Sequence, residues 1–193
     1  MFLESQINHP MQKGSIEVIC GSMFSGKTEE LLRRLKRANF AKLKVEIYKP
    51  NIDTRYDTKK VVSHDDKTVS SIVVKNSSDI LNLTNNPDIV AIDEAQFFTD
   101  NLSNVCNILA SKGIRVIVAG LDMDFLGNPF GEIPKLLAIA EHVTKVHAIC
   151  LDCGSIANHS FRTSKNNKLV SLGAINKYKP LCRKCFSENK KNA

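Results

Sequence analysis

No apolar stretch of this 193-residue sequence is long enough to cross a membrane. The first residues, Met1 to Lys13, are polar and lack the apolar core of a signal peptide. Apolar residues make up 42% of the chain and charged residues 24%, a composition that suits a globular protein with a buried core. We therefore expect a cytoplasmic protein with one ordinary domain, room for a small appendage and no membrane partner.

A disulfide framework is not expected either, because the six cysteines belong to a chain assigned to a reducing compartment. Four of them form two Cys-x-x-Cys pairs, made by Cys150, Cys153, Cys182 and Cys185. Four thiolates at this spacing predict a tetrahedral structural zinc site that closes the loop 154–181 at its base. Redox pairs are the alternative, although no neighbouring residue obviously lowers a thiol pKa. Cys20 and Cys106 are interpreted as plain buried thiols.

The formal net charge of +7 does not by itself identify a partner. A basic chain suits nucleic acid, and it equally suits a protein that handles several phosphate groups. Much of the excess lies at Lys184, Lys190 and Lys191 and in the first expected helix, where a solvated surface explains it. We therefore do not expect a nucleic acid partner.

One stretch organises the rest of the chain. It comprises Gly21, Ser22, Met23, Phe24, Ser25, Gly26, Lys27 and Thr28, two glycines four residues apart and then Lys-Thr. The apolar run 16–20 precedes it and the helix-forming run 29–36 follows it, which is the strand–loop–helix context that a phosphate loop requires. Backbone N–H groups and the helix N-terminus would surround phosphate oxygens, with Lys27 on the β- and γ-phosphates and Thr28 on Mg²⁺. The sequence thus predicts a nucleoside triphosphate site.

A second half of that site is expected at the end of the apolar run Ile89–Ile92. A buried parallel strand would deliver Asp93 to the shell of the Mg²⁺. Glu94, one residue further on, is placed to act as the catalytic base on the group that attacks the γ-phosphate.

The order of apolar and helix-forming segments predicts an α/β fold of the P-loop NTPase (RecA-like) class, with a parallel sheet flanked by helices. Strands are expected at 16–20, 45–49, 89–92, 114–120 and 143–149, and helices at 28–38, 77–83, 102–112 and 133–140. Residues 61–63 and 69–74 are expected to pair as a hairpin, and Ser77 or Ser78 to cap the helix that follows.

Four regions follow from this pattern and from the cysteine spacing. Residues 1–14 are expected to be a flexible lead, 15–149 the nucleotide-binding domain, 150–186 a zinc-binding subdomain, and 187–193 a flexible tail. The loop 121–131, which carries two Phe residues and two Gly residues, is placed to form the floor of a pocket or to be an ordinary surface loop.

These features occur together in one family. The phosphate loop, the tetrapeptide Asp53-Thr54-Arg55-Tyr56, the run Asp93 to Phe98 and the paired Cys-x-x-Cys resemble the cellular-type (type II) thymidine kinases. The resemblance extends over residues 16–186, in order and at compatible spacing. Met-Phe-Ser within the phosphate loop and Asp-Thr-Arg-Tyr are far more specific than the generic loop. It implies transfer of the γ-phosphate of ATP to the 5′-hydroxyl of thymidine, and of deoxyuridine, in salvage of nucleotides for DNA synthesis.

The resemblance also implies roles for individual residues. Around ATP it implies the phosphate loop together with Arg55, Asp93, Glu94, Ala95 and Gln96. For Mg²⁺ it implies Thr28, Asp53 and Asp93, and for the general base Glu94. The segment between the cysteine pairs resembles the family's lasso, which closes over the base through backbone groups. The implied thymidine site comprises Met23, Phe97, Leu121, Phe125, Phe130, Ser160, Ser171, Gly173 and Tyr178.

One position departs from the family pattern. Many relatives have an aromatic residue ahead of a Thr beside the thymine methyl group, whereas this chain has His159-Ser160. Loss of that Thr methyl is expected to reduce the preference for thymidine over deoxyuridine by about 1 kcal/mol. His159 is expected either to pack or to face solvent.

Two other functions are compatible with part of the pattern. Asp-Glu-Ala-Gln followed by a zinc ribbon would also suit a nucleic-acid-stimulated ATPase, but 193 residues leave no room for the second lobe of such a motor. A regulatory module that binds nucleotide without turnover would not need Glu94 beside Asp93. The resemblance further implies a homotetramer and feedback inhibition by thymidine triphosphate.

Overall fold

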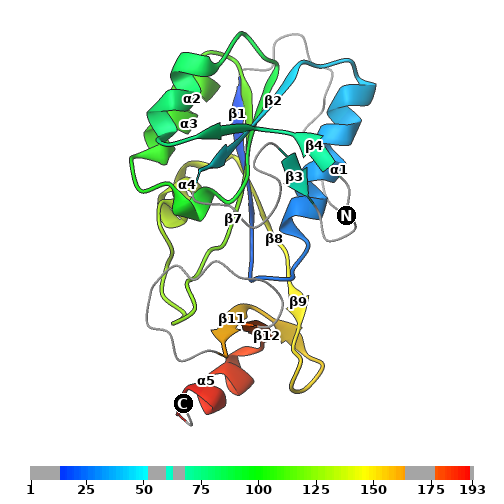
Figure 1. The fold of residues 1–193 in the computed structure, drawn as a ribbon, viewed down its shortest axis with the longest axis vertical. Coiled ribbons are helices and arrows are strands. Elements are labelled where there is room, and N and C mark those ends of the chain that lie inside the picture. The colour runs from blue at the N-terminus through cyan, green and yellow to red at the C-terminus, as the bar shows by residue number, and fades with distance from the viewer. Residues whose placement is uncertain (1–13, 52–59, 63–67, 164–176, 192–193) are drawn as a thin grey trace.

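The computed structural model describes residues 14–51, 60–62, 68–163 and 177–191. Its larger unit is a six-stranded sheet in the order β5-β2-β6-β7-β1-β8, in which every pair is parallel (Figure 1). The strands are β1 (Ser15–Cys20), β2 (Val45–Pro50), β5 (Ile72–Val74), β6 (Ile89–Ile92), β7 (Arg115–Gly120) and β8 (His142–Lys145). The predicted α/β class with a parallel sheet is therefore confirmed.

Helices cover both faces of this sheet. Helix α1 (Lys27–Phe40) lies on one face, and α2 (Ser77–Leu83), α3 (Leu102–Ser111) and α4 (Ile133–Ile139) lie on the other (Figure 1). Two apolar clusters result, one between the sheet and α1 and one between the sheet and the other helices. A strand with helices on both faces is apolar almost throughout, which explains the unbroken apolar runs of β6 and β7.

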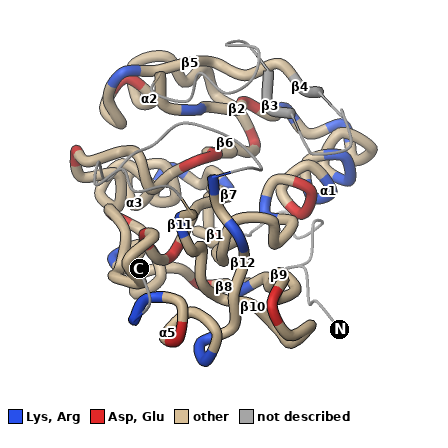
Figure 2. Tube along the Cα trace, turned by 60° about the horizontal axis from the view of Figure 1, so that its bottom comes forward, with Lys and Arg blue, Asp and Glu red and all other residues tan. Residues whose placement is uncertain are grey.

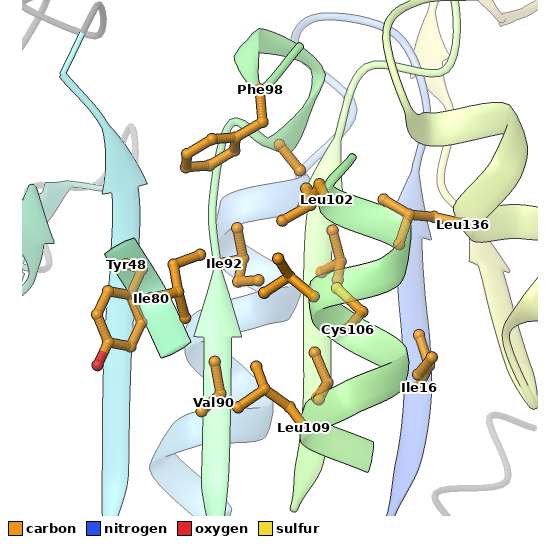
Figure 3. Close-up of a cluster of buried hydrophobic side chains, with 14 of the residues drawn as sticks. Ile16, Tyr48, Ile80, Val90, Ile92, Phe98, Leu102, Cys106, Leu109 and Leu136 are labelled. Atoms are coloured by element: carbon orange, nitrogen blue, oxygen red, sulfur yellow. The ribbon is translucent and has the colours of Figure 1, made fainter. Parts of the chain in front are cut away.

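In the larger cluster, one face of helix α3 packs against strand β6. Leu102, Cys106 and Leu109 recur at helical spacing along α3, so they lie on one face of that helix. In Figure 3 this face lies against Val90 and Ile92 of β6. All five side chains are at most 1% exposed, so the cluster is shielded from water.

The hairpin that the sequence suggested is only partly present. Strand β3 (Lys60–Val62) pairs with β4 (Thr68–Ser70) in an antiparallel register, but β4 ends before Ser71 and the next strand, β5, begins at Ile72. Residues Ile72–Val74 instead pair in parallel with Tyr48–Pro50 and form the edge of the main sheet. The prediction of one continuous strand over 69–74 was wrong because these residues have two different partners.

Helix α2 begins as expected, but its cap differs. Asn76 is the N-cap residue, and its backbone N–H donates to the Asp79 carboxylate at 3.0 Å. The backbone N–H of Ser77 donates to the Asp100 carboxylate at 2.7 Å, and its hydroxyl donates to the Asp100 carbonyl oxygen at 2.5 Å. Ser77 therefore joins α2 to the loop before α3 and does not cap its own helix.

The expected strand over 143–149 is two strands in two different sheets. β8 pairs only with β1, and the last pair joins Cys20 with Lys145. The Val146 N–H still donates to the Cys20 carbonyl oxygen at 2.8 Å, and the phosphate loop then begins at Gly21, so the described ladder between β8 and β1 ends here. The chain then leaves the main sheet, and β9 (Ala148–Ile149) pairs with β10 (Ile156–Ala157).

The smaller unit extends below the main sheet in Figure 1. It contains the β9–β10 pair, the antiparallel pair β11 (His159–Arg162) and β12 (Tyr178–Leu181), and α5 (Arg183–Lys191). Its core is formed by Ala148, Cys150, Ala157, Leu181, Cys185 and Phe186. Ala148 lies in this core, so the small unit starts slightly before Cys150. Residues 187–191, which the sequence analysis assigned to a flexible tail, are helical.

Candidate functional site

The phosphate loop connects β1 to α1 at the carboxyl edge of the sheet, where ligands of open α/β folds bind. Its backbone enters the left-handed region at Phe24 (φ 62°) and Gly26 (φ 83°), and Gly26 precedes the first turn of α1. At Gly21 a Cβ atom would lie 2.2 Å from the Val146 carbonyl oxygen, so only glycine fits. The loop therefore turns tightly beneath the N-terminus of a helix, as an anion site requires.

Two side chains at the start of α1 point back to this loop. The Lys27 ammonium donates to the Ser22 carbonyl oxygen at 2.6 Å. Burial lowers the pKa of Lys27, and the nearby carboxylates of Glu94 and Asp93 oppose that shift. The Thr28 hydroxyl donates to Asp93 Oδ2 at 3.4 Å. Residues far apart in sequence thus place a cationic group, a hydroxyl group and two carboxylates at one edge of the sheet.

The carboxylates come from the end of β6. Asp93 is 7% exposed, and its Oδ1 accepts the Glu94 N–H at 2.9 Å. Glu94 itself has a left-handed backbone, with φ 52°, and precedes the short 3₁₀ turn η1 (Ala95–Phe97). A non-glycine residue in this region carries conformational strain and is typical of functional sites. The Glu94 residue stays partly exposed.

Gln96 is almost fully buried and holds Glu94 in place. Its Oε1 accepts the Leu121 N–H at 2.9 Å, and its Nε2 donates to Glu94 Oε2 at 2.5 Å. Because a backbone N–H only donates, the Leu121 amide sets which end of the Gln96 side chain faces Glu94. The resemblance implied a place for Gln96 beside ATP, and the structure gives its side chain these two protein partners.

Apolar residues assigned to the thymidine pocket lie around this turn. The rings of Phe97 and Phe130 meet edge to face with centroids 6.0 Å apart. Leu121 directly follows β7 and is joined to Gln96 through its backbone. All three side chains are half-buried, so each retains an accessible part. The loop 121–131 therefore supplies one apolar wall beside Glu94.

The smaller unit contacts the phosphate loop through β11 and its neighbour β10. The Met23 N–H donates to Ser160 Oγ at 2.9 Å, and the Ser22 hydroxyl donates to the Ala157 carbonyl oxygen at 3.5 Å. Ser160 is only 3% exposed. Its hydroxyl is thus a hydrogen-bond partner of the phosphate loop, a contact that the sequence analysis did not predict.

Two residues further along β11, on the same face of the strand, Arg162 contacts two more of the assigned pocket residues. Its guanidinium carbon lies 3.6 Å from the centroid of the Phe125 ring, and Nη2 donates to the Tyr178 hydroxyl at 2.6 Å. The sequence analysis missed Arg162. The available signal was its spacing of two residues from Ser160 in the segment that resembles the family's lasso.

His159 packs and does not face solvent. Its side chain is 4% exposed and stacks on the Phe186 ring with centroids 4.5 Å apart. Burial, together with the positive charges of Arg183 and Lys145, lowers the pKa of His159. A Cβ on Gly127 would lie 3.3 Å from the Phe186 ring, so the loop 121–131 also rests on this stack.

The four cysteines of the predicted zinc site converge. Their sulfur atoms lie within 4.8 Å of one another, and Cys153 Sγ and Cys182 Sγ are 3.7 Å apart. Tetrahedral zinc with bonds of about 2.3 Å would separate its sulfur ligands by about 3.8 Å, so the geometry fits this metal. Hydrogen bonds from Ser155 lower the pKa of Cys153 to about 6, whereas hydrogen bonds with the neighbouring cysteines raise the pKa of Cys185.

The two remaining cysteines are buried thiols, as expected. Burial raises the pKa of Cys20 to about 11 and that of Cys106 to about 12. Both are free and at most 1% exposed, so neither has the character of a reactive thiolate.

Four assigned residues cannot be placed in this site. Asp53 and Arg55 lie in the segment 52–59, and Ser171 and Gly173 lie in the segment 164–176, both outside the described residues. The site described above therefore comprises the phosphate loop, the Asp93–Phe97 segment, the loop 121–131 and the two strands β11 and β12.

Comparison with known proteins identifies the family of this site. The family model described as thymidine kinase matches residues 14–186. A thymidine kinase of Bacteroides thetaiotaomicron is 59% identical over 96% of this chain and 94% of its own length. The chain belongs to the thymidine kinase family. Further thymidine kinases are 56% identical (Porphyromonas gingivalis, covering 96% and 92%) and 52% identical (Rhodothermus sp., covering 93% and 84%).

The family resemblance predicted from the motifs is thus confirmed, and the chain is a nucleoside kinase of this family. The alternative of a nucleic-acid-stimulated ATPase is not supported by these relatives. The ATPase DotB of Legionella pneumophila superposes with a TM-score of 0.40 at 13% identity, over 66% of this chain and 34% of that chain. Such a likeness is too low to support an argument about function.

The charges of this thymidine kinase family member are mixed rather than segregated. In Figure 2 basic and acidic positions lie next to one another along α1 and along α5. In the described part of the chain, no helix is long and apolar enough to cross a membrane.

Proposed function

We propose that this chain transfers the γ-phosphate of ATP to the 5′-hydroxyl of thymidine and gives thymidine monophosphate. The observation that carries the proposal is the placement of Glu94 beside the phosphate loop. Lys27 and Thr28 at the start of α1 meet Asp93 and Glu94 at the end of β6, and the Thr28 hydroxyl lies 3.4 Å from the Asp93 carboxylate. Membership of the thymidine kinase family supports thymidine as the acceptor.

ATP would be held by the backbone and side chains of residues 21–28. Lys27 carries the positive charge that meets the β- and γ-phosphates, and a helix N-terminus stands behind it. Thr28 and Asp93 would hold Mg²⁺, which would neutralise charge on the phosphate groups. Arg55 and Asp53 are assigned to the transferring phosphoryl group and to the magnesium shell by the family resemblance alone.

Glu94 is the proposed general base. Its carboxylate takes the proton of the 5′-hydroxyl as that oxygen forms a bond to the γ-phosphorus, and the bond to the β–γ bridging oxygen breaks to release ADP. The left-handed backbone of Glu94 and the hydrogen bond from Gln96 restrict where the carboxylate points. Positioning of this kind is the main contribution that a protein makes to phosphoryl transfer.

Thymidine is proposed to lie between the two units. Met23, Phe97, Leu121 and Phe130 would contact it from the larger unit, and Ser160 and Tyr178 from the smaller unit. Phe125 is assigned to the same pocket, and backbone groups near Ser171 and Gly173 to the recognition of the base. The four cysteines would bind structural zinc, which would hold together the strands that carry Ser160 and Tyr178.

The finer partners rest on the family resemblance. Deoxyuridine is proposed as a second acceptor, because Ser160 lacks the methyl group of the usual Thr. Thymidine triphosphate is proposed as a feedback inhibitor that occupies the nucleoside site with its phosphates toward the loop. A homotetramer is proposed as the assembled state.

Transfer of label from [γ-³²P]ATP to four deoxynucleosides and to single-stranded DNA tests the proposed function. Label is expected on thymidine, and Glu94→Gln is expected to lower kcat by about 10²- to 10⁴-fold while the KM for ATP is retained. Glu188→Gln, which neutralises an exposed carboxylate on α5, is the matched control and should behave as wild type. Label on no nucleoside, with ADP release that rises only when DNA is added, would contradict the proposal.

A further inference from the structure

Arg162 is a buried cation with no role in the proposed chemistry. Its side chain is 6% exposed, although a guanidinium group is strongly hydrated and seldom buried without close partners. Nε and Nη2 donate to the Tyr178 hydroxyl at 3.0 and 2.6 Å, and the face of the group covers the Phe125 ring at 3.6 Å. The guanidinium group of Arg162 therefore forms hydrogen bonds along its edge and stacks on an aromatic ring with its face.

These contacts join three segments of the chain. Arg162 ends β11, and Tyr178, its cross-strand partner, begins β12. Phe125 belongs to the loop 121–131, which follows β7 of the larger unit. The contact between Phe125 and Arg162 therefore spans the two units at the point where the pocket is proposed.

Arg162 also marks the base of the segment that connects β11 with β12. The next residue, Thr163, donates its N–H to the Lys177 carbonyl oxygen at 2.9 Å, so both ends of that segment are paired. Any residue that fixes Tyr178 relative to Phe125 therefore fixes two side chains that are assigned to the nucleoside site. The Arg162 guanidinium carbon lies over both of these rings, 3.6 Å from the Phe125 centroid and 5.2 Å from the Tyr178 centroid.

We infer that Arg162 is a positioning residue for the nucleoside: it sets the distance between the Phe125 and Tyr178 rings that contact the acceptor. This inference rests on the proposed function, because it assigns those rings to the nucleoside site. Arg162 acts through the two rings and does not touch the reacting atoms. Its loss therefore weakens nucleoside binding and leaves the phosphate loop and Glu94 in place.

Lysine does not replace arginine in this role. The guanidinium group is flat and has donors along its edge, so it stacks on Phe125 and bonds Tyr178 at the same time. An ammonium group is a point charge with no flat face, and it makes only one of these contacts well. A requirement for positive charge alone would be met by lysine, whereas a requirement for the planar group would not.

The test compares Arg162→Met and Arg162→Lys with Lys177→Met, which removes an exposed cation one residue from Tyr178. In both Arg162 variants we expect the KM for thymidine to rise about 10- to 100-fold, as loss of hydrogen bonds to a charged group predicts. We expect kcat within about threefold of wild type, an unchanged KM for ATP, and one zinc per chain. Lys177→Met should leave all of these values unchanged.

Two kinetic results would overturn the inference about Arg162. A KM for thymidine that stays within twofold in folded, zinc-loaded Arg162 variants overturns the inference, as does an equal rise of the KM values for thymidine and ATP. Should Arg162→Met not fold, Arg162→Lys keeps the charge and still loses the stack, so the comparison stands. A wild-type protein that phosphorylates no nucleoside contradicts the proposed function instead, which separates the two failures.

A double-mutant cycle adds a readout that general destabilisation would not reproduce. Tyr178→Phe removes the hydroxyl that accepts from Arg162 and keeps the ring. If Arg162 acts through this hydroxyl, Arg162→Met should raise the KM for thymidine by a smaller factor in Tyr178→Phe than in wild type. Full multiplication of the two single effects would show that the residues act independently and would overturn this part of the inference.

Discussion

The Gln96 side chain holds the Glu94 carboxylate through a hydrogen bond of 2.5 Å between Nε2 and Oε2. The orientation of Gln96 is determined in turn by the Leu121 N–H, which donates to its Oε1. The surrounding backbone is close, because a Cβ on Gly131 would lie 2.5 Å from the Gln96 carbonyl oxygen and one on Gly120 would lie 3.0 Å from Oε1. The proposed base is therefore oriented by the strand end of β7 as well as by its own segment.

Replacement of Gln96 by Met should lower kcat by about 10- to 100-fold, because a base that is free to turn spends less time in reach of the acceptor hydroxyl. Gln96→Glu should lower it further, since a second carboxylate would then face Glu94 and could not donate when ionised. Steady-state kinetics with both substrates check this. A normal kcat in Gln96→Met would show that Glu94 is positioned by other contacts.

Two substitutions of Ser160 separate its hydrogen bond with the phosphate loop from its proposed effect on the choice of base. Ser160→Ala removes the acceptor of the Met23 N–H, so the KM for ATP should rise about threefold to tenfold, as loss of one hydrogen bond predicts. Ser160→Thr keeps that acceptor and adds a methyl group, so it should leave the KM for ATP unchanged. It should also raise the kcat/KM ratio of thymidine over deoxyuridine by about fivefold. Equal ratios in wild type and Ser160→Thr would exclude a role in base selection.

Removal of one cysteine tests the metal site. Cys153→Ser should release zinc and either raise the KM for thymidine or unfold the smaller unit, because metal binding supplies much of the folding energy of such units. Metal analysis by atomic emission and circular dichroism check this. Cys106→Ser, at a buried cysteine outside the cluster, is the control for loss of a thiol. One zinc per chain in Cys153→Ser would show that the ligand assignment is wrong.

Stability at low pH should depend on Glu17, which is 2% exposed and paired with Arg34 at 2.6 Å and with Arg115 at 2.5 Å. Burial raises the pKa of Glu17, but the hydrogen bonds and charges of Arg115 and Arg34 outweigh burial and lower the pKa below its usual 4.5. The ionised carboxylate thus stabilises the fold above pH 4.5, and this contribution is lost as the pH falls through the lowered pKa.

Glu17→Gln should therefore reduce the free energy of unfolding at pH 7 by about 3 kcal/mol, because it leaves two arginines without their buried partner. Its unfolding free energy should also depend less steeply on pH below 4.5 than that of wild type. Urea unfolding at several pH values checks both. Lys135→Met, which removes an exposed cation from its pair with Glu132, should cost less than Glu17→Gln, because the Ser103 hydroxyl still donates to the Glu132 carboxylate. Parallel pH curves for wild type and Glu17→Gln would contradict the assignment.

Local patterns were sufficient for the central strands of the sheet, for helices α1 to α4 and for the two binding motifs. The unbroken apolar runs of β6 and β7 predicted buried parallel strands, and the phosphate loop was identified by its glycines and its Lys-Thr end. The pairing of the cysteines followed from spacing alone, and the structure brings the four sulfur atoms within 4.8 Å of one another. These features depend on residues that are close in sequence or on one well-known ligand geometry.

The predictions of strands were wrong for two segments that could pair with more than one neighbouring strand. Residues 72–74 have the composition of a hairpin strand, but they pair in parallel with β2 and become the edge strand of the main sheet. Residues 148–149 belong to the same expected strand as β8, but β1 ends at Cys20, and they pair with β10 instead. Strand composition is the same in both cases, so only the position of neighbouring strands decides the outcome.

The sequence by itself determined the phosphate loop, the carboxylates at the end of β6, the cysteine cluster and the family. Only the tertiary structure decided that Gln96 orients Glu94, that Ser160 accepts a hydrogen bond from the phosphate loop, and that Arg162 joins Phe125 to Tyr178. The physical reason is that each of these contacts is a hydrogen bond or stack of a few ångströms with a strict direction. Such contacts depend on how strands and loops from different parts of the chain are placed, and no local pattern of residues encodes that placement.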